Sequence, residues 1–404
     1  MPTNRLAVSP PAPLRGSDAG SFAHRSVVER LPAILRRVLS ENEFPPGVTE
    51  ALQQIHTEIP STPLRPISDP EAADAERWNG YVDTVDGADW LDAPWFFVET
   101  YFYRRIVAAT GYLTTPQFHV DPFSYQKDTG LRSNRLAIRS QARRLSRVLR
   151  QRPLPPSGLS EMLSQSLWGN RADLSLWAAD DDSRGDLAQP DDYLLVDDRQ
   201  AAAETIIGAS PDAKILVVAD NAGLEFVADL CLMDALLTGR RASRIHVHVK
   251  SHPTFVSDVV APDVGDTVTF LRDSIDRRVQ KLGGRLQDHL DAGRITVDDN
   301  FFWTSPLPLW EMPDTLRSEM SDYDIVIMKG DANYRRMLGD RHWDYDTPME
   351  EATGYVPVPA LALRTLKAQV VAGLTQDAMQ RAASVSEDWD TNGEWGMIQL
   401  ARPA

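Results

Sequence analysis

The sequence predicts an α/β protein in which a helical N-terminal part precedes a mostly parallel sheet with helices on both faces. After about residue 193, short apolar runs alternate with helical stripes, which is the pattern of parallel strands joined by helices. Before about residue 178, the apolar residues recur at helical spacing instead. The 404 residues are enough for two domains or subdomains.

Three segments follow from this division. Residues 1–21 are rich in Pro, Ser and Gly, lack the apolar run of a signal peptide, and are expected to form a disordered tail. Residues 22–178 are expected to form the helical domain, and residues 190–404 the α/β domain. The stretch between the two domains contains three consecutive aspartates and is typical of a solvated loop.

The composition disfavours several classes of function. The net charge, 42 − 58 = −16, makes the chain a poor general binder of nucleic acid, because phosphate repels it. No apolar run is long enough to span a membrane. Cys231 is the only cysteine, so no disulfide can form within the chain, and a cytoplasmic location is expected. Its place on an apolar helix face favours packing over a nucleophilic role.

Two features stand out in the helical part. Residues 90–112 form its strongest helical segment, aromatic on several sides, so Glu99 and Arg104 either pair inside the protein or point into a pocket. Further on, residues 132–152 carry eight arginines with an apolar stripe between them. A solvated helix face is the simpler interpretation of this run, because a nucleic-acid surface would also need interleaved aromatic residues.

Six strands are expected in the α/β domain. They are the apolar runs at residues 193–196, 215–219, 245–249, 295–297, 325–328 and 360–363. Helical stripes lie between them, such as the one from Val268 to Leu286. Because parallel strands end at the same edge of a sheet, polar residues that follow these runs are expected to meet there.

The central stretch, residues 214–225, reads KILVVADNAGLE. Its apolar run predicts a strand buried on both faces, and Asp220 and Asn221 follow it directly, before a turn and a helix. The carboxylate and carboxamide oxygens of these residues suit Mg²⁺ or Mn²⁺. A helix cap and turn made by the same two residues is the alternative.

Similar chemistry follows three other strands. The polar residues there are Asp258 after the third strand, Lys329, Asp331 and Arg335 after the fifth, and Arg364 and Lys367 after the last. Carboxylates that hold a divalent metal, beside cations that neutralise phosphoryl oxygens, favour phosphate-ester hydrolysis. Neither a GxGxxG motif after a strand nor a Walker motif is present, which weakens dinucleotide and P-loop interpretations.

Histidines on the third strand offer another metal site. His246, His248 and Lys250 share one face of that strand, and with His252 they could bind zinc. The hard oxygen ligands at the other strand ends favour a different metal, so these histidines are expected to have a structural role.

Several segments, taken in order, resemble the family of domain of unknown function 89, the metal-dependent damage-control phosphatases. They are WFFVETYFYRRI, SLWGN, VADNAGLEFVADL, HVKSHPTFVSD, FFWTSP, KGDANYRRMLGDRHWD and LRTLKAQVVAGL. The RTLK motif at residues 364–367 is similar to that of the subfamily of sugar-phosphate phosphatases. The resemblance runs from about residue 78 to the C-terminus and implies a helical domain packed on an α-β-α sandwich with a Rossmann-like sheet.

Carried over motif by motif, the resemblance implies one divalent metal, with Mn²⁺, Co²⁺, Ni²⁺ and Mg²⁺ as candidates. The implied metal ligands are Asp220, Asn221 and Asp258, and the implied substrate-binding residues are Glu225, Asp331, Asn333, Tyr334, Arg335 and Lys367. Asp220, Asp258 and Asp331 are the candidate catalytic carboxylates, with Asp331 favoured as the base. Metal-activated water and a phospho-aspartyl intermediate both stay open.

The expected function is hydrolysis of small phosphosugars such as fructose 1-phosphate, or of reactive phosphometabolites, with no obligate protein partner. One alternative, also proposed for the family, is a protein carboxyl methyltransferase that uses S-adenosylmethionine. The other is a non-catalytic sensor that binds a sugar phosphate. A metal requirement separates the phosphatase from the methyltransferase, and turnover excludes the sensor.

Overall fold

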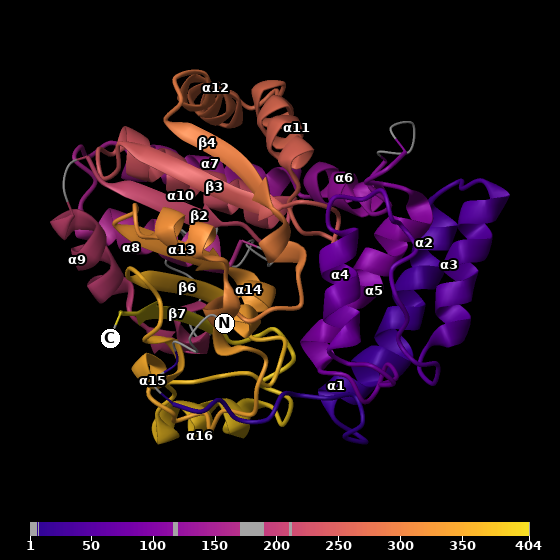
Figure 1. Cartoon of the computed structure of the whole chain (residues 1–404). Coiled ribbons are helices and arrows are strands. Elements are labelled where there is room, and N and C mark those ends of the chain that lie inside the picture. Colours follow the sequence, from indigo (N-terminus) through magenta and orange to yellow (C-terminus); the bar gives the residue numbers. More distant parts are fainter. Residues whose placement is uncertain (1–5, 7, 116–119, 170–189, 210–211, 404) are drawn as a thin grey trace.

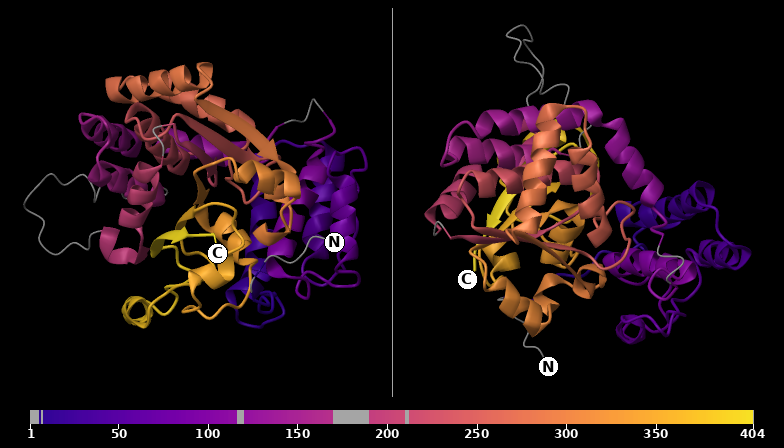
Figure 2. Two further views of the ribbon diagram at one scale, coloured as in Figure 1. Left: turned by 60° about the vertical axis from the view of Figure 1, so that its left-hand side comes forward. Right: turned by 90° about the horizontal axis from the view of Figure 1, so that it is seen from above.

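The computed structural model describes residues 6, 8–115, 120–169, 190–209 and 212–403. In it a seven-stranded sheet lies between two layers of helices, and helices α1–α5 stand beside this sandwich in every view (Figures 1 and 2). The α/β fold with a mostly parallel sheet is therefore confirmed.

The sheet contains the six predicted strands and one more. The strands are β1 Leu194–Asp197, β2 Lys214–Val218, β3 Arg244–Lys250, β4 Ile295–Asn300, β5 Ile325–Lys329, β6 Ala360–Thr365 and β7 Gly396–Ala401. β7 escaped prediction because Gly396 and Gln399 interrupt its apolar run. It lies between β1 and β6, parallel to the first and antiparallel to the second.

The spatial order of the strands, β1-β7-β6-β5-β2-β3-β4, contains a reversal of direction. From β2 the chain moves outward through β3 and β4, and from β5 it moves the other way through β6. The neighbours β2 and β5 therefore flank the topological switch point of the sheet. In open α/β sheets the crevice at the carboxyl ends of two such strands is the usual place for a ligand.

The alternation of side chains along each strand builds two cores. In β2, Ile215 and Val217 belong to the core on one face, and Leu216 and Val218 to the core on the other. The helices over the first face are α6 Ser124–Ser133, α7 Arg135–Val148, α8 Pro156–Leu167, α9 Arg199–Gly208, α10 Leu224–Thr238, α11 Ala261–Arg272 and α12 Arg277–Asp291. The helices over the second face are α13 Asp314–Met320, α14 Gly330–Leu338, α15 Met349–Thr353 and α16 Gln376–Val385.

The remaining helices pack beside the sandwich and share the second core. They are α1 Phe22–Arg25, α2 Leu31–Glu41, α3 Pro46–Glu58, α4 Ala75–Asp83 and α5 Trp95–Thr110. Within α5, Glu99 pairs with Arg335, with 2.6 Å between Oε2 and Nη1. Arg104 pairs with Asp74, with 2.8 Å between Nη2 and Oδ1. Of the two interpretations of these charged residues, the internal ion pair is therefore correct.

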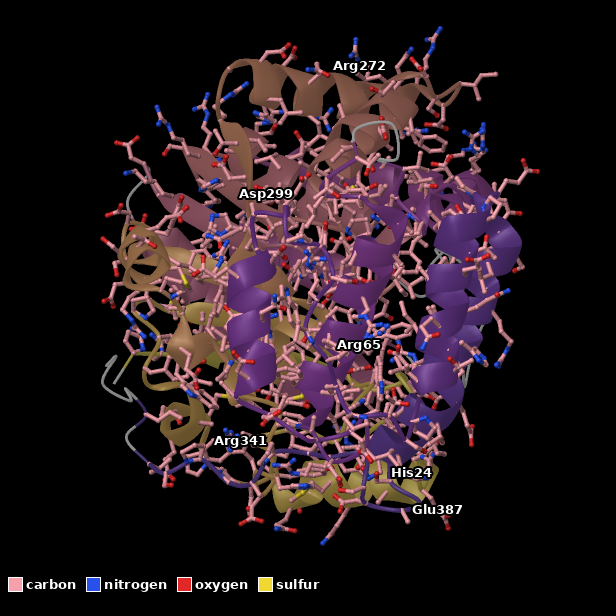
Figure 3. All side chains as sticks on the ribbon, turned by 45° about the vertical axis from the view of Figure 1, so that its right-hand side comes forward. His24, Arg65, Arg272, Asp299, Arg341 and Glu387 are labelled. Carbon is pink, nitrogen blue, oxygen red and sulfur yellow. The ribbon has the colours of Figure 1, made fainter. Side chains whose placement is uncertain are left out.

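The predicted tail is wrong for the part that the structure describes. Leu14 is buried, its N–H donates to the carbonyl of Asp340 (3.0 Å), and its own carbonyl accepts from the N–H of Trp95 (2.8 Å). His24 and Arg341 accordingly lie toward the same end of the molecule, opposite Arg272 (Figure 3). Composition predicted disorder because prolines dominate this stretch, but a proline-rich segment can still be held by backbone hydrogen bonds. Residues 1–5 and 7 lie outside the described residues.

The proposed division into residues 22–178 and 190–404 remains a prediction, because residues 170–189 are outside those described. Helices α7 and α8 pack against α10, in the layer that covers the sheet. The described helices include none with the length and apolar character of a membrane span. Cys231 is buried in α10, and burial raises the pKa of its thiol, in agreement with a packing role.

Candidate active site

The loops that follow β2 and β3 meet at the switch point of the sheet. Asn221 and Asp258 form an isolated antiparallel bridge, and the N–H of Val259 donates to the carbonyl of Asp220 (2.7 Å). These paired residues are 37 and 39 positions apart in the chain. The three predicted metal ligands therefore belong to one short piece of paired backbone.

The two carboxylates of this site are buried and close to each other. Burial, and next the charge of Asp258, raise the pKa of Asp220 well above its ordinary value. Burial likewise raises the pKa of Asp258, and the ammonium of Lys250, 3.2 Å from Asp258 Oδ2, opposes that rise. Two buried carboxylates with one adjacent ammonium form a site that additional positive charge would stabilise.

The donor atoms at this site fit a hard divalent cation. Asp258 Oδ2 is buried, and among the described residues its partner is the ammonium of Lys250, which lies 3.2 Å away as an ion pair. The amide of Asn221 has its orientation fixed, because Nδ2 donates to Asp220 Oδ2 (2.6 Å) and Oδ1 accepts from Ser257 Oγ (2.5 Å). Carboxylate and amide oxygens are the ligands that Mg²⁺ and Mn²⁺ prefer.

A cavity of about 310 Å³ lies over these residues. Its lining comes from the strand-end loops and from the N-terminal helices: Phe22, Arg30, Trp95, Asp220, Asn221, Phe255, Asp258, Asp331, Ala332, Arg335, Lys367, Thr391 and Asn392. The cavity therefore lies where the N-terminal helices close over the carboxyl edge of the sheet.

Helix α14, which follows β5 directly, supplies Asp331 and Arg335, and the loop after β6 supplies Lys367. Asp331 Oδ1 accepts from Arg364 Nε (2.8 Å) and from the backbone N–H of Lys367 (3.1 Å), which ties α14 to the end of β6 and the loop after it. The guanidinium of Arg335 lies 3.8 Å from the ring centroid of Trp95 and, besides Glu99, pairs with Asp340. The ammonium of Lys367 forms no ion pair within the described part of the chain and is exposed. Lys367 is therefore the cation most available to an anionic ligand.

Three predicted substrate-binding side chains are not among the residues that line the cavity. Asn333 is buried, and its Nδ2 donates to the carbonyl of Lys329 (2.7 Å). The hydroxyl of Tyr334 donates to Gln399 (2.9 Å) in the core, and Glu225 accepts a hydrogen bond from Asn221 (3.0 Å). Asn333 and Tyr334 therefore support the structure around the cavity, and Glu225 supports the side chain of Asn221.

Several lining residues were missed from the sequence. Phe22 and Arg30 lie almost 200 positions before the predicted metal ligands, and Trp95 lies more than 100 positions before them, so no local pattern connects these residues with the site. Lys250 does not line the cavity, and strand alternation in the sequence grouped it only with His246 and His248 on one face of β3. Its pairing with Asp258 shows why a lysine ends that strand.

His246, His248 and Glu319 bring ligand atoms within 4.8 Å of one another. The indole N–H of Trp303 can only donate, and it lies 3.1 Å from His248 Nδ1. His248 therefore carries its proton on Nε2, which donates to Glu319 Oε1 (2.9 Å). A metal ion at Nε2 would have to replace that proton and leave two N–H groups facing each other, so this cluster is better explained as a satisfied hydrogen-bond network.

Comparisons with known proteins show which family this chain resembles. Residues 26–382 match the model of the damage-control phosphatase ARMT1-like domain family. Proteins named damage-control phosphatase ARMT1 are 31% identical in Xenopus laevis, 30% in Danio rerio and 28% in Homo sapiens. The alignments cover 97–98% of this chain and 98–99% of the relatives. A solved structure of a duf89 family protein from Pyrococcus horikoshii aligns over 94% of this chain and 98% of that one, with 12% identity and a TM-score of 0.48.

Proposed function

We propose that this chain, which belongs to the damage-control phosphatase ARMT1-like domain family, is a metal-dependent phosphatase of small phosphorylated metabolites. The observation that carries the proposal is the placement of Asp220, Asn221 and Asp258 in one cavity with Lys367, at the switch point of the sheet. An oxygen ligand set facing an available ammonium is the arrangement that a phosphate ester requires. Relatives named as damage-control phosphatases support the same activity.

The residues that would hold the metal are Asp220, Asn221 and Asp258. Mn²⁺, Co²⁺, Ni²⁺ and Mg²⁺ are the candidates, and Mn²⁺ and Mg²⁺ suit the oxygen donors best. When bound, such an ion supplies positive charge beside the phosphoryl oxygens. Lys250 holds the carboxylate of Asp258 in place from behind, with 3.2 Å between Nζ and Oδ2.

Lys367 and Arg335 have different roles in phosphate binding. Lys367, with its exposed ammonium, contacts the phosphate directly. Arg335 is held by Glu99 and Asp340 and stacked on Trp95, so it presents a fixed edge to the cavity with its charge already balanced. Lys367 therefore supplies most of the electrostatic attraction, and Arg335 mainly fixes orientation.

Asp331 is the carboxylate that remains for proton transfer. Both of its hydrogen bonds from the described residues go to Oδ1. Oδ2 is thus available at the cavity to take a proton from an attacking water, or from the water that would release phosphate from an aspartyl intermediate on Asp220. Either route uses the same arrangement of residues.

The size and lining of the cavity support small substrates such as fructose 1-phosphate. A volume of about 310 Å³ is at the lower end of small-molecule sites. Thr391 and Asn392 offer hydrogen bonds to sugar hydroxyls, and Trp95 and Phe22 offer apolar surface for the sugar carbons. Removal of the phosphate from a reactive phosphometabolite would suit the same cavity.

Phosphate release from fructose 1-phosphate, other phosphosugars and p-nitrophenyl phosphate tests the proposal, with each candidate metal or with EDTA. We expect release with Mn²⁺ or Mg²⁺ that EDTA abolishes. Methyl transfer from S-adenosylmethionine that is indifferent to EDTA would favour the methyltransferase. Tight binding of the phosphosugar without any turnover would favour the sensor.

A further inference from the structure

Residues 11–17, in the indigo stretch before α1 (Figure 1), pair with two segments that are far apart in the sequence, and we call them the N-terminal strap. The first segment is the turn after α14. The N–H of Leu14 donates to the carbonyl of Asp340 (3.0 Å), and the N–H of His342 donates to the carbonyl of Ala12 (3.0 Å). These two bonds belong to an antiparallel bridge. One side of the strap is thus attached to the sandwich.

The second segment is the start of α5, in the helices beside the sandwich. The N–H of Trp95 donates to the carbonyl of Leu14 (2.8 Å), and Arg15 forms an antiparallel bridge with Pro94. The side chain of Leu14 is buried. A single residue, Leu14, therefore connects the two parts of the protein, through its N–H to the turn after α14 and through its carbonyl to α5.

The composition of the strap suits a docked, extended segment. Pro11 and Pro13 have no N–H and hold φ near −65°, so this stretch is already extended before it docks. The chain therefore loses less conformational entropy when it is fixed. The proline carbonyls still accept hydrogen bonds, and that of Pro11 accepts from Arg341 Nη1 (2.7 Å). The prolines that suggested a disordered tail thus favour attachment at a defined place.

The two residues that Leu14 joins are also the residues that hold Arg335. The carboxylate of Asp340 accepts from Nε (2.7 Å) and Nη2 (3.2 Å) of Arg335, and the ring centroid of Trp95 lies 3.8 Å from the guanidinium. Glu99, one turn further along α5, accepts from Nη1 (2.6 Å). Within the described part of the chain, these carboxylates take three of the five guanidinium N–H groups. One N–H on Nη1 and one on Nη2 remain for a ligand in the cavity that Arg335 lines.

We propose that the N-terminal strap positions Arg335 for the phosphate group of the substrate, by fixing Asp340 and Trp95 relative to each other. This role rests on the proposed phosphatase function. Asp340 belongs to the sandwich and Trp95 to the helices beside it, so the edge that Arg335 presents depends on how these two parts meet. The two backbone hydrogen bonds of Leu14 cross that joint. Loss of the strap lets α5 shift against α14 and turns the remaining N–H groups of Arg335 away from the phosphate.

A strap that only stabilises the fold would behave differently. Its loss would lower the temperature of unfolding and leave the kinetic constants of the folded protein unchanged. A strap that positions Arg335 affects phosphate binding in the folded protein. Because the contact with phosphate exists in both the substrate complex and the transition state, its weakening raises KM and leaves kcat nearly unchanged. The separate behaviour of KM and kcat therefore distinguishes the two roles.

Leu14→Pro tests the proposal in the full-length chain, because proline lacks the N–H that reaches Asp340. We expect KM for fructose 1-phosphate and the inhibition constant of inorganic phosphate to rise roughly tenfold, as for one charge-assisted contact, with kcat changed less than about twofold. Leu14→Met keeps the N–H and a side chain of similar volume, and should match the wild type. Thermal unfolding shows that each variant is folded. Unchanged KM and inhibition constant in folded Leu14→Pro overturn the proposal.

Ser17→Pro is the matched control. It removes another backbone N–H of the strap, which donates to the carbonyl of Leu91 (2.9 Å) and not to a residue that holds Arg335. KM and the inhibition constant of inorganic phosphate should equal those of the wild type. An equal rise in Ser17→Pro and Leu14→Pro would contradict the specific role of Leu14.

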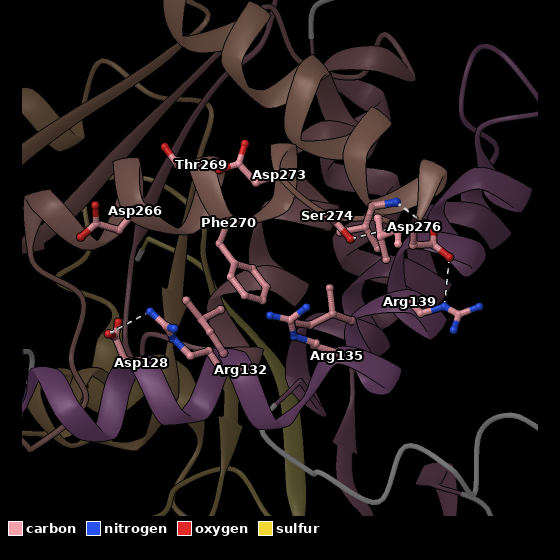
Figure 4. A pocket seen from close by; sticks show the side chains of 14 residues that line it. Asp128, Arg132, Arg135, Arg139, Asp266, Thr269, Phe270, Asp273, Ser274 and Asp276 are labelled. Atoms are coloured by element: carbon pink, nitrogen blue, oxygen red, sulfur yellow. Dashed lines mark hydrogen bonds and ion pairs between the residues drawn. The ribbon is translucent and has the colours of Figure 1, made fainter.

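Hydrogen exchange of the wild type tests the same proposal without a variant. Linkage requires phosphate to slow the opening of the strap by the factor by which the strap improves phosphate binding. With Mn²⁺ present, saturating inorganic phosphate should therefore slow amide exchange roughly tenfold in the peptides that contain Leu14 and His342. Residues 269–279 are the control, because they line the recess between α6–α7 and α11–α12 (Figure 4) and not the active-site cavity.

The outcomes separate this proposal from the proposed function. Equal exchange with and without phosphate, or equal slowing in the strap and in residues 269–279, overturns the role of the strap. Normal phosphate release by the wild type with unchanged KM in Leu14→Pro overturns the role of the strap alone. A wild type that neither binds nor releases phosphate overturns the phosphatase proposal and the strap proposal together.

Discussion

Gly330 lies directly against the carboxylate of Asp220. A Cβ atom added to Gly330 would be 1.8 Å from Asp220 Oδ2, far inside any allowed contact, and the φ of Gly330 is +81°. Glycine is therefore required at the first position of α14 for two reasons, its backbone conformation and the space that the carboxylate occupies. The carboxylate after β2 and the start of α14 can thus lie this close together only because residue 330 is glycine.

Substitution Gly330→Ala should remove activity and also lower the free energy of unfolding, because alanine is strained at a φ of +81°. The methyl group must displace the carboxylate of Asp220, and a shift of about 1 Å at a catalytic group typically lowers the rate roughly a hundredfold. Phosphate release and the Mn²⁺ affinity should fall together. Gly284→Ala is the matched control, because Gly284 lies in α12 with nothing within 4 Å of the added atom. Equal activity of the two variants would show that Asp220 does not need its present position.

Lys367→Gln should raise KM far more than it changes stability. The exposed ammonium is lost without leaving a buried partner, so the free energy of unfolding should change by no more than about 0.5 kcal/mol. A charge-assisted contact to phosphate is worth roughly 1.5–3 kcal/mol, which corresponds to at least a tenfold rise in KM and in the inhibition constant of inorganic phosphate. Lys281→Gln, at an exposed position on α12, should change neither KM nor the inhibition constant of inorganic phosphate. An unaltered inhibition constant in Lys367→Gln would place the phosphate elsewhere.

His246→Ala should leave the metal requirement unchanged. The imidazole of His246 contacts Asp298 (2.7 Å) and Tyr323 (2.5 Å), and we assign it to a hydrogen-bond network. The Mn²⁺ concentration that gives half-maximal phosphate release should equal that of the wild type. A large increase in this Mn²⁺ concentration would mean that the cluster of His246, His248 and Glu319 holds the metal, and not Asp220, Asn221 and Asp258.

The buried His252 should make the protein sensitive to acid. Burial, and next the charge of Arg104, lower the pKa of His252 to about 4. Because this folded-state pKa lies below the unfolded value of about 6.5, the unfolded chain binds more protons between the two values. The stabilising contribution of neutral His252 is therefore complete above about pH 6.5 and is lost as the pH falls toward 4.

Urea unfolding of wild type and His252→Gln at pH 7 and pH 4.5 measures this contribution. The wild type should lose roughly 2–3 kcal/mol more than the variant between the two pH values, since one unit of pKa corresponds to about 1.36 kcal/mol. Parallel losses in the two proteins would mean that His252 is protonated in the folded state or accessible to solvent.

Strand prediction succeeded where local pattern determines structure. The six apolar runs became β1–β6. The central strands β2, β5 and β6 are buried on both faces and so need a continuous run of apolar residues, whereas the edge strands β1 and β4 are only partly buried and have shorter runs. The meeting of Asp220 with Asp331 also followed from the sequence, since both residues come after strands of a parallel sheet. β7 shows the limit, because tertiary context and not its own composition makes Gly396–Ala401 a strand.

The substrate loop shows a different limit. The sequence singled out Asp331, Asn333, Tyr334 and Arg335 as one group, but α14 begins at Gly330 and separates them. Positions 331, 332 and 335 share the helix face that lines the cavity, whereas Asn333 and Tyr334 point into the core. A helical projection of this segment would have found the division. No such projection finds Arg30 or Trp95, which reach the cavity only through the packing of distant helices.

Mn²⁺ binding by isothermal titration calorimetry, with phosphate release from fructose 1-phosphate in the same samples, tests the central claim most directly. The proteins to compare are the wild type and Asp258→Asn, with thermal unfolding to show that both are folded. We expect the variant to lose both Mn²⁺ binding and phosphate release, because Asp258 supplies a buried charged ligand. Normal Mn²⁺ binding and EDTA-sensitive release by folded Asp258→Asn would contradict the assignment of the metal to this site.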